Sequence, residues 1–419
     1  MQAPAEAADP TRLGILIASL KVGGAERAAL GLLAEFRRAG VDAYLLALDR
    51  NREMFETVQG EARELLAPCI VGLSGADIRW RTVSKVLVGP WQWLALERAV
   101  RRLDRTMILS IMERANIMSL LTLAPRRRIL SVRSYPSELL SSKSPLKRFL
   151  VLRLYRLLLR RADRIVFVSR EAAADFARLF PETSRRSSVI YNACDVDGMR
   201  RLARSPLPSG FESVFEHPVV IACGRMSPEK GHWELVRAFG ELSRRDPEVR
   251  LVIVGTGPLE RDLARLCHRL GIAERVVFPG FQSNPLAWIA RARVFVLPSA
   301  WEGFPNSLLE ALACGVPVVA SDCRSGPREL LAPETDATIK TDRIERTPCG
   351  FLVPPPGSPR PGPSDPLTRE EHFFAEAIER LLRDDGLRKS QAEAASRRVS
   401  EFKPDRIIPR WLALFRELS

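Results

Sequence analysis

Short apolar, β-rich runs alternate with segments of helical periodicity along almost the whole chain. Repeated strand–helix units favour parallel sheets with both faces buried, because each connection carries a helix across the sheet. The runs predict strands at 13–19, 43–48, 107–112, 128–132, 164–169 and 188–191, and at 219–224, 249–255, 275–279, 294–298, 316–321 and 350–353. The alternation therefore predicts an α/β protein with two doubly wound, Rossmann-like sheets in tandem.

Chain length also predicts two domains. Single hydrophobic cores stop growing at about 250–300 residues, and this chain has 419. Residues 192–218 include Pro206, Pro208, Ser209 and Gly210 and are predicted to be an interdomain linker, whereas the seven prolines of 354–366 predict an exposed, extended loop. We expect domains over residues 1–200 and 210–400, and a C-terminal helix within 401–419 that packs back on the first domain.

The net charge of +14 is concentrated in one part of the chain. Residues 126–205 contain 19 Lys and Arg against 7 Asp and Glu, a net charge of +12, so an acidic partner is expected there.

The seven cysteines form no Cys-x-x-Cys pair, which predicts neither a disulfide scaffold nor a zinc site and favours a reducing cytoplasmic compartment. The N-terminus lacks the basic region of a signal peptide, and no apolar stretch is long enough to span a bilayer.

Two acids, Glu302 and Glu310, are the most informative polar pair. Glu302 follows a predicted strand and Glu310 lies about one turn inside the next predicted helix, so both can face one ligand. Backbone N–H groups at the start of that helix can bind phosphate, and carboxylates accept hydrogen bonds from sugar hydroxyls. The alternative is a chance spacing in which one acid only caps the helix. The residues between them are Gly303, Phe304, Pro305, Asn306 and Ser307.

A second motif, residues 224–231, follows the predicted strand that ends at Gly224. Its cations Arg225 and Lys230 can together neutralise a diphosphate as charge develops on a departing nucleotide. The alternative is a solvated turn whose cations pair with neighbouring acids. Combined with the acidic pair, the motif favours a site for a sugar joined to a diphosphate.

Two glycine motifs give weaker signals. Gly23 and Gly24 open the first predicted helix, where a ligand could approach the backbone amides, although turn geometry alone also explains them. The motif that contains Gly255 and Gly257 does not match a dinucleotide fingerprint, because Glu260 occupies the third glycine position.

Residues 145–162 predict an amphipathic helix rich in leucine and arginine. On a helical wheel the arginines share one arc and the leucines lie opposite. Such a helix suits an anionic membrane surface, but an ordinary domain helix with its leucines on the sheet is an equal alternative. Both hold if the arginines meet lipid headgroups while the leucines pack inward. The residues concerned are Arg148, Arg153, Arg156 and Arg160, and Leu150, Leu154, Leu157 and Leu158.

These motifs, in this order, resemble the retaining glycosyltransferases of family 4, which have the GT-B fold with two Rossmann-like domains facing each other across a cleft. The matching segments are 23–26, 162–169, 191–192, 224–231, 254–258, 280–281 and 302–315. The resemblance implies that Arg225 and Lys230 bind the donor diphosphate, and that Glu302 contacts sugar hydroxyls. We predict these three residues as the catalytic set. The predicted donor-binding set is Gly23, Gly24, Asn192, Gly224, Gly257, Phe281, Gly303, Phe304, Pro305, Asn306, Ser307 and Glu310, the last at the nucleotide ribose.

The sequence departs from the family in one respect. Many relatives have an N-domain histidine near the donor sugar, whereas the first histidine here is His217. The comparable strand end contains Arg133 and Ser134, which resembles a subset acting on lipid-linked saccharides in bacterial glycan assembly. We predict Arg133 and Ser134 on the acceptor side.

The predicted function is retaining transfer of a hexose or N-acetylhexosamine from a nucleotide sugar, with a UDP-sugar favoured over GDP-mannose. The expected acceptor is a saccharide on a polyprenyl diphosphate. We expect no metal or other cofactor, no nucleic acid, and peripheral binding through residues 145–162 at the cytoplasmic face of the inner membrane. The alternatives are a nucleotide-sugar epimerase or phosphorylase on the same fold, and a non-catalytic basic adaptor at the membrane surface.

Overall fold

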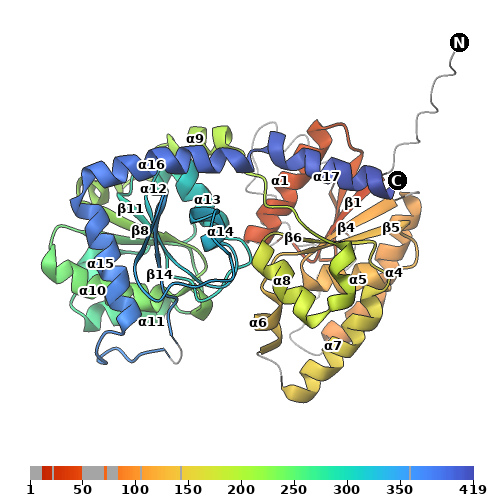
Figure 1. Ribbon diagram of the computed structural model, residues 1–419, viewed down its shortest axis with the longest axis horizontal. Coiled ribbons are helices and arrows are strands. Elements are labelled where there is room, and N and C mark those ends of the chain that lie inside the picture. The colour runs from red at the N-terminus through yellow and green to blue at the C-terminus, as the bar shows by residue number, and fades with distance from the viewer. Residues whose placement is uncertain are drawn as a thin grey trace, which may run out of the picture. The chain divides into compact units, whose positions relative to one another are not determined.

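The structure is a computed structural model that describes residues 12–20, 23–49, 70–72, 84–103, 106–141, 144–357 and 360–419. The N-terminal segment assessed above for a signal peptide lies outside these ranges. The chain forms two compact α/β units (Figure 1). The first comprises Met1–Val168, Ala172–Ala193 and Pro404–Ser419, and the second comprises Ser169–Glu171 and Cys194–Lys403.

Described strands of the first unit form one parallel sheet in the order β3-β2-β1-β4-β5-β6-β7. The central strand β1 has five consecutive buried residues after Arg12, as expected for a strand covered on both faces. All six predicted strands are present, and β3 is an addition that the sequence did not predict. The strands are β1 Arg12–Ile17, β2 Ala43–Ala47, β3 Ile70–Gly72, β4 Thr106–Ile111, β5 Arg127–Val132, β6 Arg164–Phe167 and β7 Ser187–Val189.

Helices cover this sheet, and the last one comes from the end of the chain. Helix α17 packs on α1, where the Phe36 ring meets the rings of Trp411 and Phe415 at centroid distances of 6.1 and 5.2 Å (Figure 1). These aromatic residues belong to the largely aliphatic core on one side of β1. The described helices are α1 Gly24–Arg38, α4 Ser84–Arg102, α5 Glu113–Leu121, α6 Pro136–Ser141, α7 Pro145–Leu159, α8 Arg170–Leu179 and α17 Pro404–Leu418, with the 3-10 helix η2 Pro181–Arg186.

In the second unit the strand order is β10-β9-β8-β11-β12-β14-β13 among the described residues. All neighbours are parallel except β13, which pairs antiparallel with β14 at the edge. The six predicted strands are again present, and the short edge strand β13 was not predicted. The strands are β8 Val219–Cys223, β9 Arg250–Val254, β10 Val276–Val277, β11 Val294–Leu297, β12 Val318–Ser321, β13 Glu345–Thr347 and β14 Gly350–Val353.

The helices of the second unit follow the same alternation with the strands. Its α-helices are α9 Val196–Ala203, α10 His232–Arg245, α11 Glu260–Arg269, α12 Leu286–Ile289, α13 Asn306–Ala313, α14 Pro327–Leu331, α15 Arg369–Arg383 and α16 Asp385–Val399. Its 3-10 helices are η3 Glu212–Glu216, η4 Pro228–Lys230, η5 Ala273–Arg275 and η6 Ser400–Phe402.

The prediction of a linker over residues 192–218 is wrong at α9, which is a helix of the second unit. Asp195 caps α9 by accepting a hydrogen bond from the Gly198 backbone N–H at 2.9 Å. Arg200, from the same helix, donates to the backbone carbonyl of Ala313 at the end of α13 at 3.2 Å. A capped helix packed on its neighbour is therefore part of the second unit.

The proline-rich segment has no regular helix or strand in its described residues, as predicted, but it is not simply exposed. The buried Arg237 guanidinium donates to four of its backbone carbonyls and pairs with Glu371 at 2.7 Å. One buried cation therefore supplies hydrogen-bond donors to carbonyls of a segment whose prolines have no backbone N–H. The four carbonyls belong to Gly362, Pro363, Asp365 and Pro366.

Candidate active site

Two loops at the carboxyl ends of β8 and β9 are joined by backbone hydrogen bonds. The Met226 N–H donates to the Thr256 carbonyl, and the Leu259 N–H donates to the Met226 carbonyl, each at 3.0 Å. A Cβ on Gly257 would lie 2.4 Å from the Met226 carbonyl oxygen, so only glycine permits this approach. Close backbone packing accounts for Gly257, whose predicted donor contact remains a proposal.

Gly231 brings the cationic turn against the end of β11. It has φ = 66°, and a Cβ there would lie 1.9 Å from the Pro298 carbonyl oxygen. The Ala300 N–H also donates to the Glu229 carbonyl at 2.8 Å. The turn of residues 224–231 is thereby held beside the loop that contains Glu302.

Lys230 and Glu302, predicted to contact different parts of a donor, form an ion pair. The Lys230 ammonium donates to both carboxylate oxygens at 2.7 and 2.9 Å, and the Ser299 hydroxyl donates to Oε1 at 2.7 Å. Glu302 is only 6% exposed. Burial alone would lower the pKa of Lys230, but the Glu302 carboxylate outweighs it and raises the pKa above its ordinary value. The lysine is therefore charged at neutral pH.

The second predicted cation lies in the same turn but is exposed. Arg225 follows Gly224 directly after β8, and no carboxylate pairs with it among the described residues. One cation of the turn is thus fixed by Glu302, while the other is accessible to an anion. This pair of environments suits a diphosphate better than the alternative of a turn whose cations both pair with neighbouring acids.

The loop between the two acids is tightly packed. Phe304 is buried, and its ring lies 5.9 Å from that of Phe402. Ser325 Oγ donates to the Gly303 carbonyl at 2.6 Å. The loop then enters α13 through Pro305 and Asn306. The side chain of Phe304 therefore contributes packing, and a donor contact from this part of the loop would come from its backbone.

Glu310 is buried in α13 beside two thiols. Burial, together with the Glu310 carboxylate, raises the pKa of Cys194 and of Cys314 to about 12. Both thiols are therefore neutral at physiological pH, and neither is activated as a nucleophile. Of the other residues predicted to bind the donor, Asn306 and Ser307 begin α13, and Phe281 is exposed after β10.

In the first unit, the structure joins two predicted residues that are far apart in the sequence. Arg133, just after β5, donates to the Asn192 side-chain oxygen at 2.7 Å and to Ser131 Oγ at 3.2 Å. Ser134 is buried next to it. Arg133 and Ser134, predicted on the acceptor side, and Asn192, predicted to bind the donor, therefore belong to one cluster.

The start of α1 differs from the anion site that Gly23 and Gly24 suggest. A Cβ on Gly23 would lie 2.3 Å from Glu26 Oε2, so a carboxylate occupies the space beside the helix start. Burial raises the pKa of Glu26, although a hydrogen bond from its own backbone N–H opposes this effect. An incoming phosphate would therefore meet this carboxylate first.

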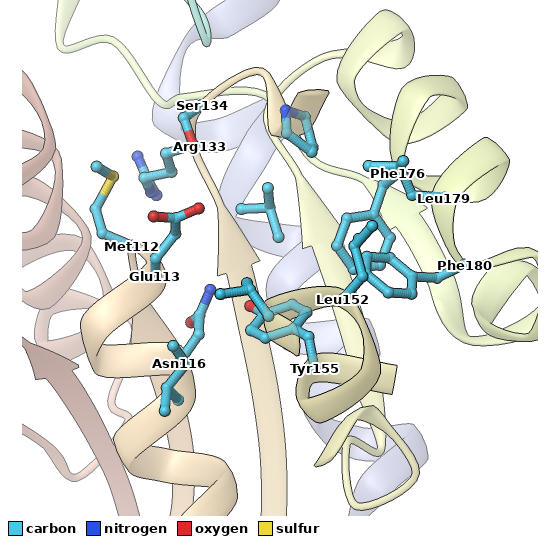
Figure 2. A pocket seen from close by; sticks show the side chains of 14 residues that line it. Met112, Glu113, Asn116, Arg133, Ser134, Leu152, Tyr155, Phe176, Leu179 and Phe180 are labelled. Carbon is cyan, nitrogen blue, oxygen red and sulfur yellow. The ribbon is translucent and has the colours of Figure 1, made fainter. Parts of the chain in front are cut away.

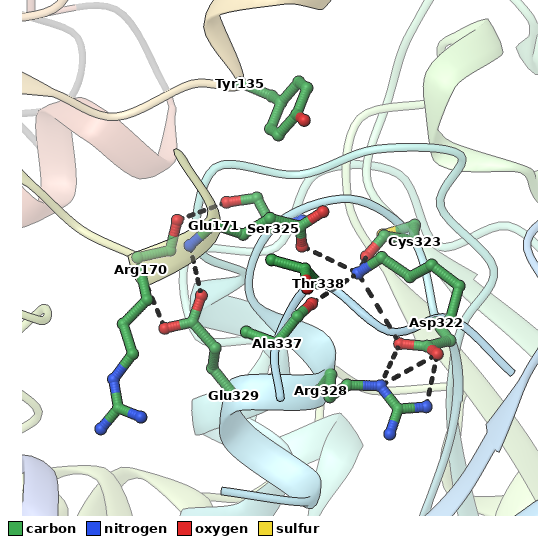
Figure 3. A network of polar contacts seen from close by, with 12 residues as sticks. Tyr135, Arg170, Glu171, Asp322, Cys323, Ser325, Arg328, Glu329, Ala337 and Thr338 are labelled. Atoms are coloured by element: carbon green, nitrogen blue, oxygen red, sulfur yellow. Dashed lines mark hydrogen bonds and ion pairs between the residues drawn. The ribbon is translucent and has the colours of Figure 1, made fainter. Parts of the chain in front are cut away.

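A polar network around Ser325 supports the loop and was missed by sequence reasoning (Figure 3). Ser325 has φ = 71°, an uncommon value for a non-glycine residue, and its hydroxyl is 2.5 Å from Ser169 Oγ. Its backbone N–H donates to Glu171, which also pairs with Lys340 at 2.8 Å. Glu329 accepts hydrogen bonds from the backbone of residues 170 and 171. The sequence signal was the Ser-Gly-Pro run at 325–327, which begins α14.

His232, at the first position of α10, was also missed. It is buried, and its Nδ1 atom has no hydrogen-bond partner among the described residues. Burial, with a smaller contribution from the Lys230 charge, lowers the pKa of His232 to about 3. The imidazole is therefore neutral beside the Lys230 ammonium.

Comparison with known proteins gives the family. A model described as Glycosyltransferase Family 4 matches residues 22–197, and one described as Glycosyl transferases group 1 matches residues 217–384. Over 290 residues the chain is 30% identical to an uncharacterized glycosyltransferase of Methanocaldococcus jannaschii, covering 68% of this chain and 71% of that protein. The chain belongs to glycosyltransferase family 4.

Other relatives of this glycosyltransferase span nearly its full length. It is 26% identical over 397 residues to the N-acetylgalactosamine-N,N'-diacetylbacillosaminyl-diphospho-undecaprenol 4-alpha-N-acetylgalactosaminyltransferase of Campylobacter jejuni, covering 93% and 95% of the two chains. Anabaena HepE in complex with UDP and glucose matches with a TM-score of 0.72 at 20% identity, covering 97% of this chain and 100% of that one. The fold is GT-B, as predicted, and the enzyme is a glycosyltransferase of glycan biosynthesis.

Two further observations concern the membrane and metals. Within the described ranges, every helix is too short or too polar to cross a lipid bilayer. In the same ranges, no three His, Cys, Asp or Glu side chains are grouped so that they could hold a metal ion.

Proposed function

We propose that this glycosyltransferase moves a hexose or N-acetylhexosamine, with retention, from a UDP-sugar to a saccharide carried on a polyprenyl diphosphate. The Lys230–Glu302 ion pair is the observation that carries the donor side, because it fixes a charged ammonium next to an exposed second cation. The Campylobacter relative, whose name specifies a diphospho-undecaprenol acceptor, supports the acceptor class. The Anabaena complex with UDP supports the donor base.

In this proposal, Arg225 and Lys230 hold the two phosphates of the donor. As the bond to the sugar breaks, negative charge grows on the departing diphosphate, and two fixed cations stabilise it without reorganisation. Glu302 orients the ammonium and accepts hydrogen bonds from the sugar, while Glu310 contacts the ribose. We propose that these cations serve in place of a metal, so activity should persist in EDTA.

Substitution of Lys230 tests the donor site. Lys230→Ala is expected to lower kcat/KM at least 100-fold, in the range seen when one preorganised charge-stabilising group is removed. Lys403→Ala is a matched control, because Lys403 also pairs with a carboxylate, Asp197 at 3.0 Å, and neither residue belongs to the predicted site. Activity is measured as sugar transfer from labelled UDP-sugars to a prenyl-diphosphate saccharide. Full activity of Lys230→Ala would refute the site.

Membrane binding through α7 is part of the same proposal. The expectation that its leucines pack inward is wrong for Leu150, Leu154 and Leu157, which are 56%, 53% and 59% exposed, whereas Leu158 is buried. The helix contains no acidic residue, and the Arg153 guanidinium lies over the exposed Phe149 ring at 5.2 Å. A surface that mixes apolar side chains with cations suits anionic headgroups such as those of the cytoplasmic leaflet of the inner membrane.

A further inference from the structure

The first unit contains a cavity of about 240 Å³ between α5, the end of β5, α7 and α8 (Figure 2). Leu152, Tyr155, Phe176 and Phe180 form one wall. The rings of Phe176 and Phe180 lie 4.8 Å apart, and that of Tyr155 lies 5.8 Å from Phe180. Such a wall offers aromatic and aliphatic surface to an apolar ligand.

The opposite wall of the cavity is polar. Arg133, Glu113 and Asn116 line it, and Figure 2 shows Arg133 and Glu113 on the side away from the phenylalanines. Arg133 donates hydrogen bonds to Ser131 and Asn192, and both of these partners are neutral. Burial lowers the pKa of Arg133 to about 10. The cation therefore bears a desolvation cost that an anion would offset, provided that the anion contacts Arg133 rather than Glu113.

Backbone strain also occurs at this cavity. Met112, which lines it, has φ = 73° at the junction of β4 and α5. Non-glycine residues rarely adopt this conformation, and such residues concentrate at ligand sites. The strained junction places Glu113 and Asn116 of α5 on the cavity wall.

Helix α7 connects the cavity with the exposed apolar surface described above. Leu152 and Tyr155 face the cavity, whereas Leu150, Leu154 and Leu157 are exposed on the same helix. A helix with its side chains is about 10–12 Å across. A lipid chain that leaves a membrane at α7 therefore has only one helix to pass before it reaches the cavity.

We propose that this cavity binds the phosphate-proximal isoprenoid segment of the acceptor, with its chain against Leu152, Tyr155, Phe176 and Phe180 and its phosphate at Arg133. The inference rests on the proposed lipid-linked acceptor and assigns where its lipid part lies. A cavity of about 150 Å³ holds benzene, so by proportion this one holds about ten carbon atoms, or two isoprene units.

The test is a calorimetric titration of the full-length protein, without donor, against prenyl diphosphates of increasing length. We expect affinity to rise at least tenfold from inorganic pyrophosphate to geranyl diphosphate and to level off at farnesyl diphosphate. No rise with chain length would overturn the proposal. Equal affinity for n-decyl diphosphate would overturn the isoprenoid assignment. This series uses only the unmodified protein.

Two variants locate the binding site. Leu152→Trp, which fills the cavity, is expected to abolish the increase in affinity that the geranyl chain gives over pyrophosphate, while leaving the affinity for pyrophosphate unchanged. Leu154→Trp is the matched control on the exposed side of α7 and should keep the gain. Equal behaviour of the two variants would overturn the assignment.

A third variant, Arg133→Gln, tests the phosphate end of the site. It should weaken the binding of geranyl diphosphate at least tenfold but leave the binding of geraniol unchanged. An equal loss of affinity for both ligands would overturn the role of Arg133.

Failure of this inference is distinguishable from failure of the proposed function. If the enzyme transfers sugar to a saccharide acceptor with a methyl aglycone and shows no gain from a prenyl chain, the cavity assignment is wrong and the transferase assignment stands. If geranyl diphosphate binds as described but no UDP-sugar supports transfer, the cavity assignment stands and the proposed function is wrong.

Discussion

At the scale of the residue, Gly231 shows how the absence of one side chain positions Lys230, the residue next to it. Gly231 and Gly271 have nearly the same positive φ, 66° and 69°. A Cβ would meet the Pro298 carbonyl oxygen at Gly231, but nothing within 4 Å at Gly271. We expect Gly271→Ala to lower the free energy of unfolding by about 1–2 kcal/mol, the usual penalty of the left-handed conformation. Gly231→Ala should lose clearly more, and also donor binding.

Urea denaturation and nucleotide titration of both variants check this prediction. The comparison separates the steric contact from the cost of a positive φ, because the two glycines have nearly the same φ and differ in the contact. Equal losses of stability would show that the approach of the turn to β11 does not depend on glycine.

His232 predicts a pH dependence at the same scale. Its pKa is about 3 in the folded protein and about 6.5 when unfolded, so between these values only the unfolded chain takes up the proton. The free energy of unfolding therefore does not depend on His232 protonation above pH 6.5, and it falls by up to about 1.4 kcal/mol per pH unit from there toward pH 3.

The change His232→Phe is expected to remove this part of the acid destabilisation. The substitution breaks no hydrogen bond at Nδ1, because this atom has no partner among the described residues. The measurement is the difference in free energy of unfolding between wild type and variant at pH 7 and pH 5. A pH-independent difference would contradict the prediction.

At the scale of the element, the sequence predicted strands better than it predicted contacts. Apolar runs of four to seven residues marked all the central strands, because strands buried on both faces need them. Strand β13 and helix α9 were not predicted. Strand β13 is a short polar strand at the edge of the sheet, and α9 lies just before Pro206 and Pro208 in the segment that was predicted to be a linker. The motifs indicated that Lys230 and Glu302 belong to one site. Their direct ion pair depends on packing of Gly231 against Pro298, which no local pattern encodes.

Membrane binding by helix α7 can be tested at the scale of the element. A triple change of Leu150, Leu154 and Leu157 to Ser is expected to weaken binding to phosphatidylglycerol vesicles at least tenfold, because each exposed leucine contributes buried apolar area in the membrane. Leu202→Ser, at another half-exposed leucine in α9 of the second unit, is the control and should have no effect. Vesicle flotation measures both. Equal flotation of the triple variant and wild type would refute the role of α7.

At the scale of the whole molecule, the chain passes between its two units more than once. It enters the second unit at Cys194 and returns to the first at Pro404, so α17 completes a core that begins with β1. Length predicted two domains, and the terminal apolar pattern predicted the helix. The contribution of α17 to the first core follows from a contact between residues nearly 400 positions apart, which sequence periodicity does not report.

Trp411 makes this dependence measurable. It is 1% exposed and packs on Phe36, yet its Nε1–H finds no acceptor among the described residues. Trp411→Ala should destabilise the first unit by about 3–5 kcal/mol through loss of a large core side chain. Trp411→Phe should cost much less, because removing a buried, unsatisfied N–H offsets part of the lost volume. Hydrogen exchange of the β1 and β8 amides reports the two units separately. If Trp411→Ala lowers protection equally in β1 and β8, or Trp411→Phe is as harmful as Trp411→Ala, this account of the tryptophan is wrong.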